Sequence, residues 1–319
     1  MDCFGDSSDE EEEDVLRRDA SCGVCSFHSN TEASLLTHVR NASNIQGPID
    51  VLHSVDAFCN QRHWMMHIGP EKGVILKRVL NDAMNKKAAT LNNADASFNF
   101  NCVELGTYCG YSSILMANEF RHASASVHCH WYTAEIEREY FTIAKELIKM
   151  AGMDDVVSVH QISYDGHETN VVEVINNALK NKEHAETTKP VIDFLFIDHD
   201  KDAYKSDLIK FEQSGLIGKG TKVVADNVVF AQIQDYIQYV QDRQEEGILQ
   251  TTTLKCRVEY CGENMNDYED GIGKKVIFIN KGCLLLVFST TLMHNYFLLL
   301  PSPTFTEVTD YLKDPVAGR

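Results

Sequence analysis

Short apolar runs alternate with longer segments of helical spacing through the middle of this chain. Five apolar runs are short enough to be buried strands and lie at residues 98–105, 128–134, 156–161, 191–197 and 222–225. Each is followed by a segment of helical periodicity, and these segments lie at residues 112–120, 137–150, 170–179, 202–213 and 233–243. Strands that alternate with helices in this way form βαβ units and run parallel. The pattern therefore predicts one α/β domain built around a mostly parallel sheet.

The flanking segments complete this domain and add two tails. Residues 32–80 have helical spacing with a break at Gly69-Pro70, and residues 251–260 and 275–279 can pair as a hairpin at the edge of the sheet. No internal repeat and no Pro- or Ser-rich linker interrupts these segments. We therefore expect three regions, namely an acidic disordered tail at residues 1–30, one domain at residues 31–282 and an apolar C-terminal extension at residues 283–319.

The charge of the chain limits its partners. Much of the formal net charge of −18 comes from residues 6–14, which carry seven carboxylates and are typical of a solvated arm. We expect no duplex nucleic-acid partner, because phosphate neutralisation needs clustered Lys and Arg. Residues 283–300 hold no formal charge but include several polar residues, so we favour an additional packed element there over a membrane anchor.

The cysteines indicate a reducing compartment. Ten cysteines are scattered without a repeating spacing, and acidic residues stand where a signal peptide would carry basic ones. We therefore expect free thiols and a cytoplasmic protein. The first gaps between Cys22, Cys25, His28 and His38 resemble a zinc finger, but no second histidine follows at the required distance, so we expect no zinc there.

Ligands of such sheets bind beyond the carboxyl ends of the strands. The first strand leads into Glu104-Leu105-Gly106, and its glycine permits a tight turn and close approach of the backbone to a ligand. Taken alone, this is also compatible with a plain strand–helix turn. Glu135 ends the second strand, where a carboxylate can accept hydrogen bonds from a ribose diol. Two acids at adjacent strand ends predict a cofactor that contains a nucleoside.

Two further strand ends carry the strongest local signal. The strand at residues 191–197 is followed by Asp198 and Lys201, and the strand at residues 222–225 by Asp226 and Asn227. If these strands are neighbours, three oxygen donors enter one crevice, which suits Mg²⁺ with open positions for water or substrate. The alternative is that these residues only cap the next helices. That alternative explains single residues better than the whole cluster.

Four blocks of the sequence together resemble catechol O-methyltransferases: NQRHWMMHIGPEKG, ELGTYCGYSS, IDHDKDAY and GLIGKGTKVVADNV. The resemblance runs in order from about Leu35 to Lys281. It implies the Rossmann-like class I methyltransferase fold, a seven-stranded, mostly parallel sheet with one reversed edge strand and helices on both faces. It also implies S-adenosyl-L-methionine and Mg²⁺ as cofactors.

The resemblance assigns roles to the acidic and basic residues. Asp198, Asp226 and Asn227 match the magnesium ligands of the family, and Asn227 also faces the substrate. Lys201 matches the lysine that takes the proton from the attacking hydroxyl, and a neighbouring divalent cation disfavours its ammonium form. Glu259 matches the glutamate that holds the second hydroxyl.

Further positions match the cofactor and substrate pockets. Trp64 matches an aromatic wall of the substrate pocket. The positions that correspond to cofactor contacts are Met66, Gly69, Glu104, Gly106, Tyr108, Ser112, Glu135, Tyr164 and His199. The chain departs from the family at the adenine, where Asp200 replaces a stacking tryptophan and Tyr164-Asp165 replaces a Ser-Gln pair; near Ala231 a proline of the substrate pocket is also missing. Metal and base positions are unaffected by these changes.

The implied reaction is the Mg²⁺-dependent transfer of a methyl group from S-adenosylmethionine to one hydroxyl of a catechol, as in catechol or catecholamine metabolism. Two adjacent oxygens can chelate the metal together, so a vicinal diol is expected. We expect a monomer with a small-molecule substrate. Two alternatives stay open, namely another vicinal-diol aromatic metabolite as substrate and a non-catalytic cofactor-binding scaffold.

Overall fold

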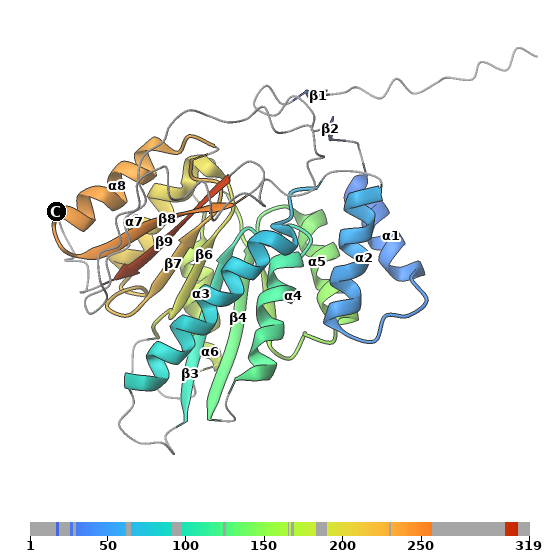
Figure 1. The fold of residues 1–319 in the computed structure, drawn as a ribbon, viewed down its shortest axis with the longest axis horizontal. Coiled ribbons are helices and arrows are strands. Elements are labelled where there is room, and N and C mark those ends of the chain that lie inside the picture. Colours follow the sequence, from blue (N-terminus) through green and yellow to red (C-terminus); the bar gives the residue numbers. More distant parts are fainter. Residues whose placement is uncertain are drawn as a thin grey trace, which may run out of the picture.

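The computed structural model describes residues 17–18, 26–27, 30–61, 65–90, 97–123, 126–164, 166, 169–182, 190–229, 231–256 and 304–311. Its centre is a seven-stranded sheet in the order β5-β4-β3-β6-β7-β9-β8 (Figure 1). The strands of this sheet are β3 (Phe98–Leu105), β4 (Val127–Glu135), β5 (Val157–Gln161), β6 (Phe194–Ile197), β7 (Lys222–Ala225), β8 (Leu249–Cys256) and β9 (Thr304–Tyr311). Two short strands, β1 (Arg17–Arg18) and β2 (Ser26–Phe27), pair separately.

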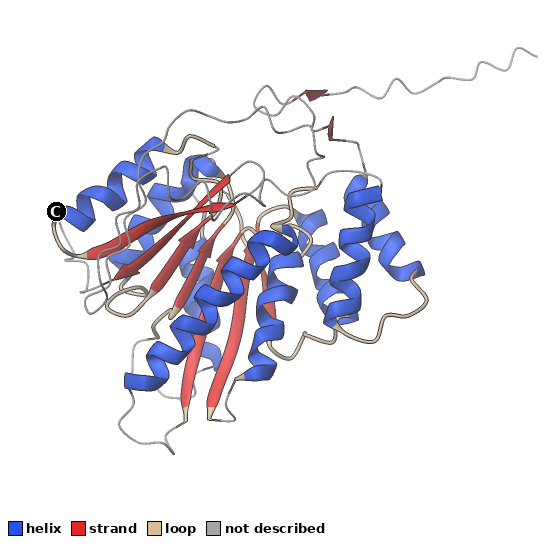
Figure 2. Cartoon of the chain, in the orientation of Figure 1, coloured by secondary structure: helices blue, strands red, loops and turns tan. Residues whose placement is uncertain are grey.

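Helices cover both faces of the sheet (Figure 2). On one face lie α1 (Thr31–Asn41), α2 (Pro48–Gln61), α3 (Gly69–Thr90), α4 (Tyr111–Asn118) and α5 (Arg138–Met150). On the other lie α6 (Val171–Lys182), α7 (Tyr204–Ser214) and α8 (Gln234–Glu245). Two short 3-10 helices, η1 (Glu119–His122) and η2 (Lys201–Ala203), extend α4 and precede α7.

Alternation along the central strands divides the core into two layers. In β6, Phe194 and Phe196 belong to the core layer on the side of α1–α5, whereas Leu195 and Ile197 belong to the layer on the side of α6–α8. All four side chains are buried, as expected for a central strand whose successive residues point to opposite faces. Burying one such side chain contributes roughly 1.5–3 kcal/mol. The sheet is thus a rigid support for the loops at its ends.

The register brings the carboxyl ends of the central strands to one level. Leu105 of β3 stands beside Ile197 of β6, and Ile197 stands beside Ala225 of β7. The backbone N–H of Asp198 donates to Leu105, and that of Asp226 donates to Ile197, so the pairing continues one residue past each strand. The residues that follow these strands therefore lie side by side.

The predicted fold class is confirmed, but the strand beside β8 comes from an unexpected part of the chain. β9 runs antiparallel to β7 and to β8 and is the reversed strand at this edge of the sheet. It belongs to the segment that we expected as a C-terminal extension. The partner predicted for β8, residues 275–279, lies outside the described residues, as does the apolar run 283–300.

A buried glutamate ties β9 to the helices behind it. The Glu212 carboxylate in α7 accepts hydrogen bonds from the hydroxyls of Tyr311 in β9 and Tyr239 in α8, and Arg243 approaches to 3.2 Å. Glu212 and Tyr311 are both buried. Since buried polar groups are stable only when paired, this network fixes the position of the reversed strand.

No helix in the described part of the chain is long and apolar enough to cross a membrane.

Candidate active site

The loop between β3 and α4 lies in direct backbone contact with the end of β6. Gly106 has φ +93°, and a β-carbon at this position would lie 2.3 Å from the carbonyl oxygen of Asp198. Gly110 follows with φ +85° at the start of α4, where a β-carbon would contact α5. Only glycine combines these dihedral angles with such close approach. The loop is therefore folded onto the strand end that carries Asp198.

Glu104, near the end of β3, fixes this loop from inside the core. Its fully buried carboxylate accepts hydrogen bonds from the hydroxyls of Ser112 and Ser113 and from the indole N–H of Trp131. Burial raises the pKa of Glu104, and the hydrogen bonds from the serines and Trp131 oppose this shift. Both serines stand in the first turn of α4, so Glu104 joins the end of β3 to the beginning of that helix.

Glu135 at the end of β4 closes the other side of the loop. Its carboxylate accepts backbone N–H groups from Tyr108 at 2.8 Å, Ile136 at 2.9 Å and Glu137 at 2.8 Å. Burial raises its pKa, whereas these N–H groups favour the charged form. A carboxylate offers about four acceptor positions, and three of them accept from the described residues, so a fourth can accept from a ligand.

Tyr108 connects the loop to α1. Its backbone is left-handed, with φ +47°, and its hydroxyl donates to the Glu32 carboxylate at 2.6 Å. Its ring lies edge-on to Tyr140 and tilted against His67, with centroid distances of 4.9 and 5.1 Å. The left-handed conformation is costly for a tyrosine, and such strain is concentrated at ligand sites.

His67 is a neutral imidazole inside this aromatic group. Its side chain is 8% exposed and stacks on Tyr111, and its Nε2 has no hydrogen-bond partner in the described structure. Burial lowers the pKa of His67 from 6.5 to about 3. The histidine is therefore uncharged at neutral pH.

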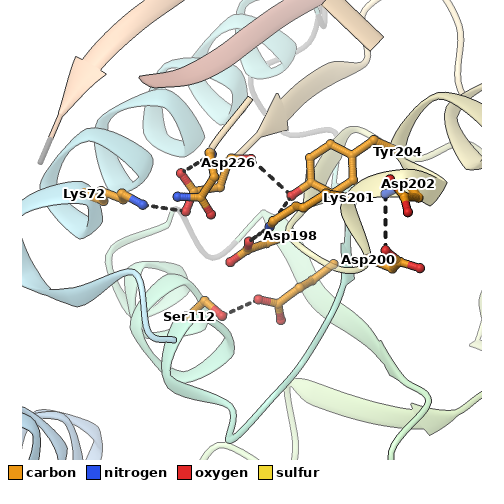
Figure 3. A network of polar contacts seen from close by, with 10 residues as sticks. Lys72, Ser112, Asp198, Asp200, Lys201, Asp202, Tyr204 and Asp226 are labelled. Carbon is orange, nitrogen blue, oxygen red and sulfur yellow. Dashed lines mark hydrogen bonds and ion pairs between the residues drawn. The ribbon is translucent and has the colours of Figure 1, made fainter. Parts of the chain in front are cut away.

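Two carboxylates and two lysines meet at the ends of β6 and β7 (Figure 3). Lys201 Nζ donates to Asp198 Oδ1 at 2.8 Å, and Lys72 Nζ donates to Asp226 Oδ2 at 2.7 Å. Burial raises the pKa of Asp198; Lys201 opposes this shift, and the nearby Asp226 adds to it. Asp198 and Asp226 are thus close enough for each carboxylate to disfavour the charge of the other.

The backbone after β7 orients the third oxygen donor. Asn227 is left-handed, with φ +60°, a conformation that asparagine tolerates better than most residues. Its N–H donates to Asp226 Oδ1 at 2.8 Å, which fixes the carboxylate. Asn227 is partly exposed, whereas Asp226 is buried. The amide of Asn227 is therefore open to ligands beside the two carboxylates.

Tyr204 holds Lys201 in place from α7. The buried phenol oxygen accepts a hydrogen bond from Lys201 Nζ at 2.7 Å and donates to the backbone carbonyl of Asp226 at 3.1 Å. Its ring is stacked on His199, with centroids 5.3 Å apart, and His199 Nε2 lies 2.9 Å from Asp207 Oδ2. Together these contacts position Lys201 beside Asp198.

Comparison with known proteins adds an independent observation. The O-methyltransferase from Bacillus cereus in complex with SAH covers 88% of this chain and 97% of its own, with 16% identity and a TM-score of 0.49. Catechol O-methyltransferase B of Danio rerio is 31% identical over 244 residues, 76% of this chain and 77% of the relative. Catechol O-methyltransferase of Bos taurus is 30% identical over 213 residues, 67% of each chain. The family model described as O-methyltransferase matches residues 58–254.

This chain belongs to the O-methyltransferase family. It is a catechol O-methyltransferase-like class I enzyme that uses S-adenosylmethionine, as the family match and these relatives show. The methyl donor of this O-methyltransferase suits the β3–α4 loop, since Glu135 has an acceptor position left for a ribose hydroxyl. The first turn of α4 follows directly, and helix N-termini favour anionic groups such as the carboxylate of the cofactor.

The donors beside this loop also suit Mg²⁺. Two carboxylate oxygens and an amide oxygen are hard ligands, and the buried Asp226 beside Asp198, whose side chain is 18% exposed, would favour a divalent cation. In the described part of the chain, no three His, Cys, Asp or Glu side chains form a group that could hold a metal ion. The third oxygen that could contact a cation beside Asp198 and Asp226 belongs to the amide of Asn227.

Most of the predicted positions lie around the carboxyl edge of the sheet. Lys201, His199 and the three predicted metal ligands follow β6 and β7, while the cofactor positions of the β3–α4 loop and Glu135 follow β3 and β4. Met66 and Tyr164 are exposed, and Gly69 begins α3 with φ +60°. Trp64 and Glu259 lie outside the described residues. The side chain of Glu104 is directed inward, into the contacts with α4.

Three contacts of the O-methyltransferase site escaped the sequence prediction. Lys72, Tyr204 and Glu32 pair with residues far away in the chain or across an element boundary. Lys72 and Tyr204 do stand inside two of the four matched blocks, near the ends of NQRHWMMHIGPEKG and IDHDKDAY. Their place in these blocks was the one sequence feature that could have marked them as residues of the site. Periodicity alone assigns both residues only to helices.

Proposed function

We propose that this O-methyltransferase transfers the methyl group of S-adenosylmethionine to one hydroxyl of a catechol, with Mg²⁺ held by Asp198, Asp226 and Asn227. The observation that carries this proposal is the pairing of Lys201 with Asp198 at 2.8 Å, beside the buried Asp226. Because Lys201 contacts a carboxylate that is proposed to bind the metal, it is close enough to take a proton from a hydroxyl that is bound to the same metal.

Lys201 is the group that removes the proton. Its side chain is 33% exposed, so a substrate hydroxyl can reach Nζ. When bound, Mg²⁺ would favour loss of a proton from a hydroxyl that it contacts. The ammonium form of Lys201 would be disfavoured beside the bound cation, so that its amine can take that proton, and Asp198 and the Tyr204 hydroxyl accept hydrogen bonds from the ammonium that results. General-base assistance of this kind contributes about 10²–10⁴-fold to a rate.

The remaining predicted residues position the two reactants. The cofactor is expected against Met66, Gly69 and Tyr108, with its ribose at Glu135. The exposed apolar side chains of Ile136 and Tyr164 follow β4 and β5 and offer a surface for the adenine, where Asp200 provides none. Holding the hydroxyl and the methyl in line is the larger share of the rate enhancement.

The substrate class follows from the donors around the metal position. Asn227 is partly exposed and is proposed to face the substrate, together with Glu259 and Trp64 from segments outside the described residues. Two adjacent hydroxyls could both contact a cation held in this site, whereas a single phenol would supply only one of these two oxygens. A catechol or another aromatic vicinal diol is therefore the proposed substrate. The enzyme is also proposed to be monomeric and cytoplasmic.

A methyl-transfer assay tests this proposal. Purified protein is incubated with labelled S-adenosylmethionine and dihydroxybenzoate, with Mg²⁺ or with excess chelator. We expect labelled product only with Mg²⁺, and no product from monohydroxybenzoate, which is the matched control. Turnover that survives complete metal removal would refute the metal assignment. Tight cofactor binding without turnover on any diol would favour the non-catalytic alternative.

A further inference from the structure

The carboxylate of Asp226 already has a buried cationic partner. Lys72 Nζ lies 2.7 Å from Asp226 Oδ2, and only 6% and 3% of the two side chains are exposed. Lys72 extends from α3, and Asp226 follows β7, 154 positions later in the chain. A lysine buried to this degree is rarely tolerated without such a partner.

The two lysines of the site approach the carboxylates from opposite sides. In Figure 3, Lys72 reaches Asp226 from α3, whereas Lys201 reaches Asp198 from the side of Tyr204. The formal charges are two negative and two positive, so these four side chains are balanced without a cation. Lys201 is partly exposed and can contact a substrate, but Lys72 is enclosed. The lysines therefore have different tasks.

We propose that Lys72 is a positioning residue that serves as the resident counter-ion of Asp226 and sets the affinity of the site for divalent cations. It keeps the Asp226 carboxylate paired and oriented while no cation is bound. Because its ammonium stays close after a cation arrives, it also weakens cation binding by repulsion. This inference rests on the proposed role of Asp226 as a metal ligand.

The geometry supports both parts of this role. Each carboxylate oxygen has two lone pairs, so Asp226 can donate to a cation while it accepts hydrogen bonds from Lys72 and from the N–H of Asn227. Repulsion between charges a few ångströms apart near a protein surface corresponds to more than a tenfold change in an equilibrium constant. The result is a site whose ligands are in place before the cation binds, at the cost of affinity.

Removal of the Lys72 charge tests the inference. In Lys72→Met, the buried carboxylate loses its ion pair with Lys72, so a divalent cation no longer meets the repulsion of that ammonium. We expect Mg²⁺ and Mn²⁺ to bind at least tenfold more tightly than to wild-type protein, by calorimetry and by Mn²⁺ electron paramagnetic resonance. We also expect a lower melting temperature in chelator and a larger rise on addition of Mg²⁺.

Three further variants make the test specific. Lys72→Gln removes the charge but can still donate a hydrogen bond to Asp226, and it should show the same tightening. Lys72→Arg keeps the charge and should bind Mg²⁺ like the wild type. Lys77→Met is the matched control, because Lys77 lies on the same helix, is 34% exposed and pairs with Glu119 at 3.8 Å, outside the site. It should leave cation affinity unchanged.

The outcomes separate this inference from the proposed function. If wild-type protein binds no divalent cation, the proposed magnesium site fails. If the wild type binds Mg²⁺ but both neutral Lys72 variants bind it equally or more weakly, the counter-ion role is overturned and the proposed function stands. Failure of both neutral variants to fold even with Mg²⁺ would likewise contradict the role, because the cation should replace the missing charge.

Discussion

A β-carbon on Gly106 would lie 2.3 Å from the carbonyl oxygen of Asp198, so the β3–α4 loop and the end of β6 touch through their backbones. This contact joins the two halves of the site. A substitution at Gly106 should therefore displace both the β3–α4 loop and the backbone of Asp198.

The first prediction concerns this contact. Gly106→Ala should reduce affinity for S-adenosylmethionine and the rate of methyl transfer by at least tenfold, because the loop and Asp198 must separate. Backbone strain alone should cost about 1–3 kcal/mol. Gly220→Ala is the matched control, since Gly220 has φ +98° and nothing within 4 Å of its β-carbon position. Calorimetry and thermal unfolding measure both effects; equal loss of cofactor affinity in the two variants would contradict the prediction.

The second prediction concerns the base. Lys201→Met should lower kcat by about 10²–10⁴-fold, the usual contribution of a general base, while affinity for S-adenosylmethionine stays within about twofold. Lys205→Met, four residues later in the first turn of α7, serves as control and should keep the wild-type rate. Stopped assays with labelled cofactor give the rates. An unchanged rate in Lys201→Met would remove its assignment as the base.

The third prediction follows from the buried histidine. The pKa of His67 is about 3 in the folded protein and 6.5 in the unfolded chain, so only the unfolded chain takes up a proton between these values. Its contribution to stability is complete above pH 6.5 and falls as the pH decreases towards 3, by about 1.4 kcal/mol per pH unit.

Denaturant titrations at several pH values measure this slope. Between pH 6.5 and roughly pH 5, His67→Gln should lose about 2 kcal/mol less stability than the wild type. His128→Gln is the control, because His128 is exposed on β4, and it should retain the wild-type slope. Identical slopes in all three proteins would show that His67 does not cause the acid sensitivity.

The fourth prediction concerns the reversed strand. Tyr311→Phe leaves the buried Glu212 without one of its donors, which should lower the free energy of unfolding by about 1–3 kcal/mol. Tyr239→Phe removes a donor to the same carboxylate at a less buried place and should cost less. Cofactor affinity should not change in either variant. A larger loss in Tyr239→Phe would contradict this order.

The central strands could be predicted because burial on both faces leaves a clear mark in the sequence. Phe98–Leu105 has the bounds that we expected, and β6 lies within the predicted run 191–197. The partner of β8 could not be predicted in this way, because local periodicity contains no information about which distant segment completes a sheet. Thr304–Tyr311 is rich in residues of strand propensity, but its apolar residues Phe305, Val308 and Tyr311 are three positions apart, so it lacks the alternation that marks a strand.

The closeness of Asp198 and Asp226 was predictable for a topological reason. Parallel strands end at one edge, so adjacency of β6 and β7 is enough to bring Asp198 to Asp226. The partners of these acids were not predictable from spacing. Lys72 lies on a helix that precedes the whole sheet, and its burial depends on how α3 crosses the strand ends. Likewise, only the fold shows that Tyr204 supports Lys201.

The place of β9 has a consequence for synthesis of the protein. Lys222 of β7 pairs with Asp310, and Leu249 of β8 pairs with Tyr311. On the ribosome, β7 and β8 are thus made long before the strand that separates them, and β7 presents an open edge during this interval. Such edges are sites of aggregation, and long-range pairing is slow. We expect nascent chains that stop before residue 304 to need chaperones, whereas the longer chain can close its sheet without them.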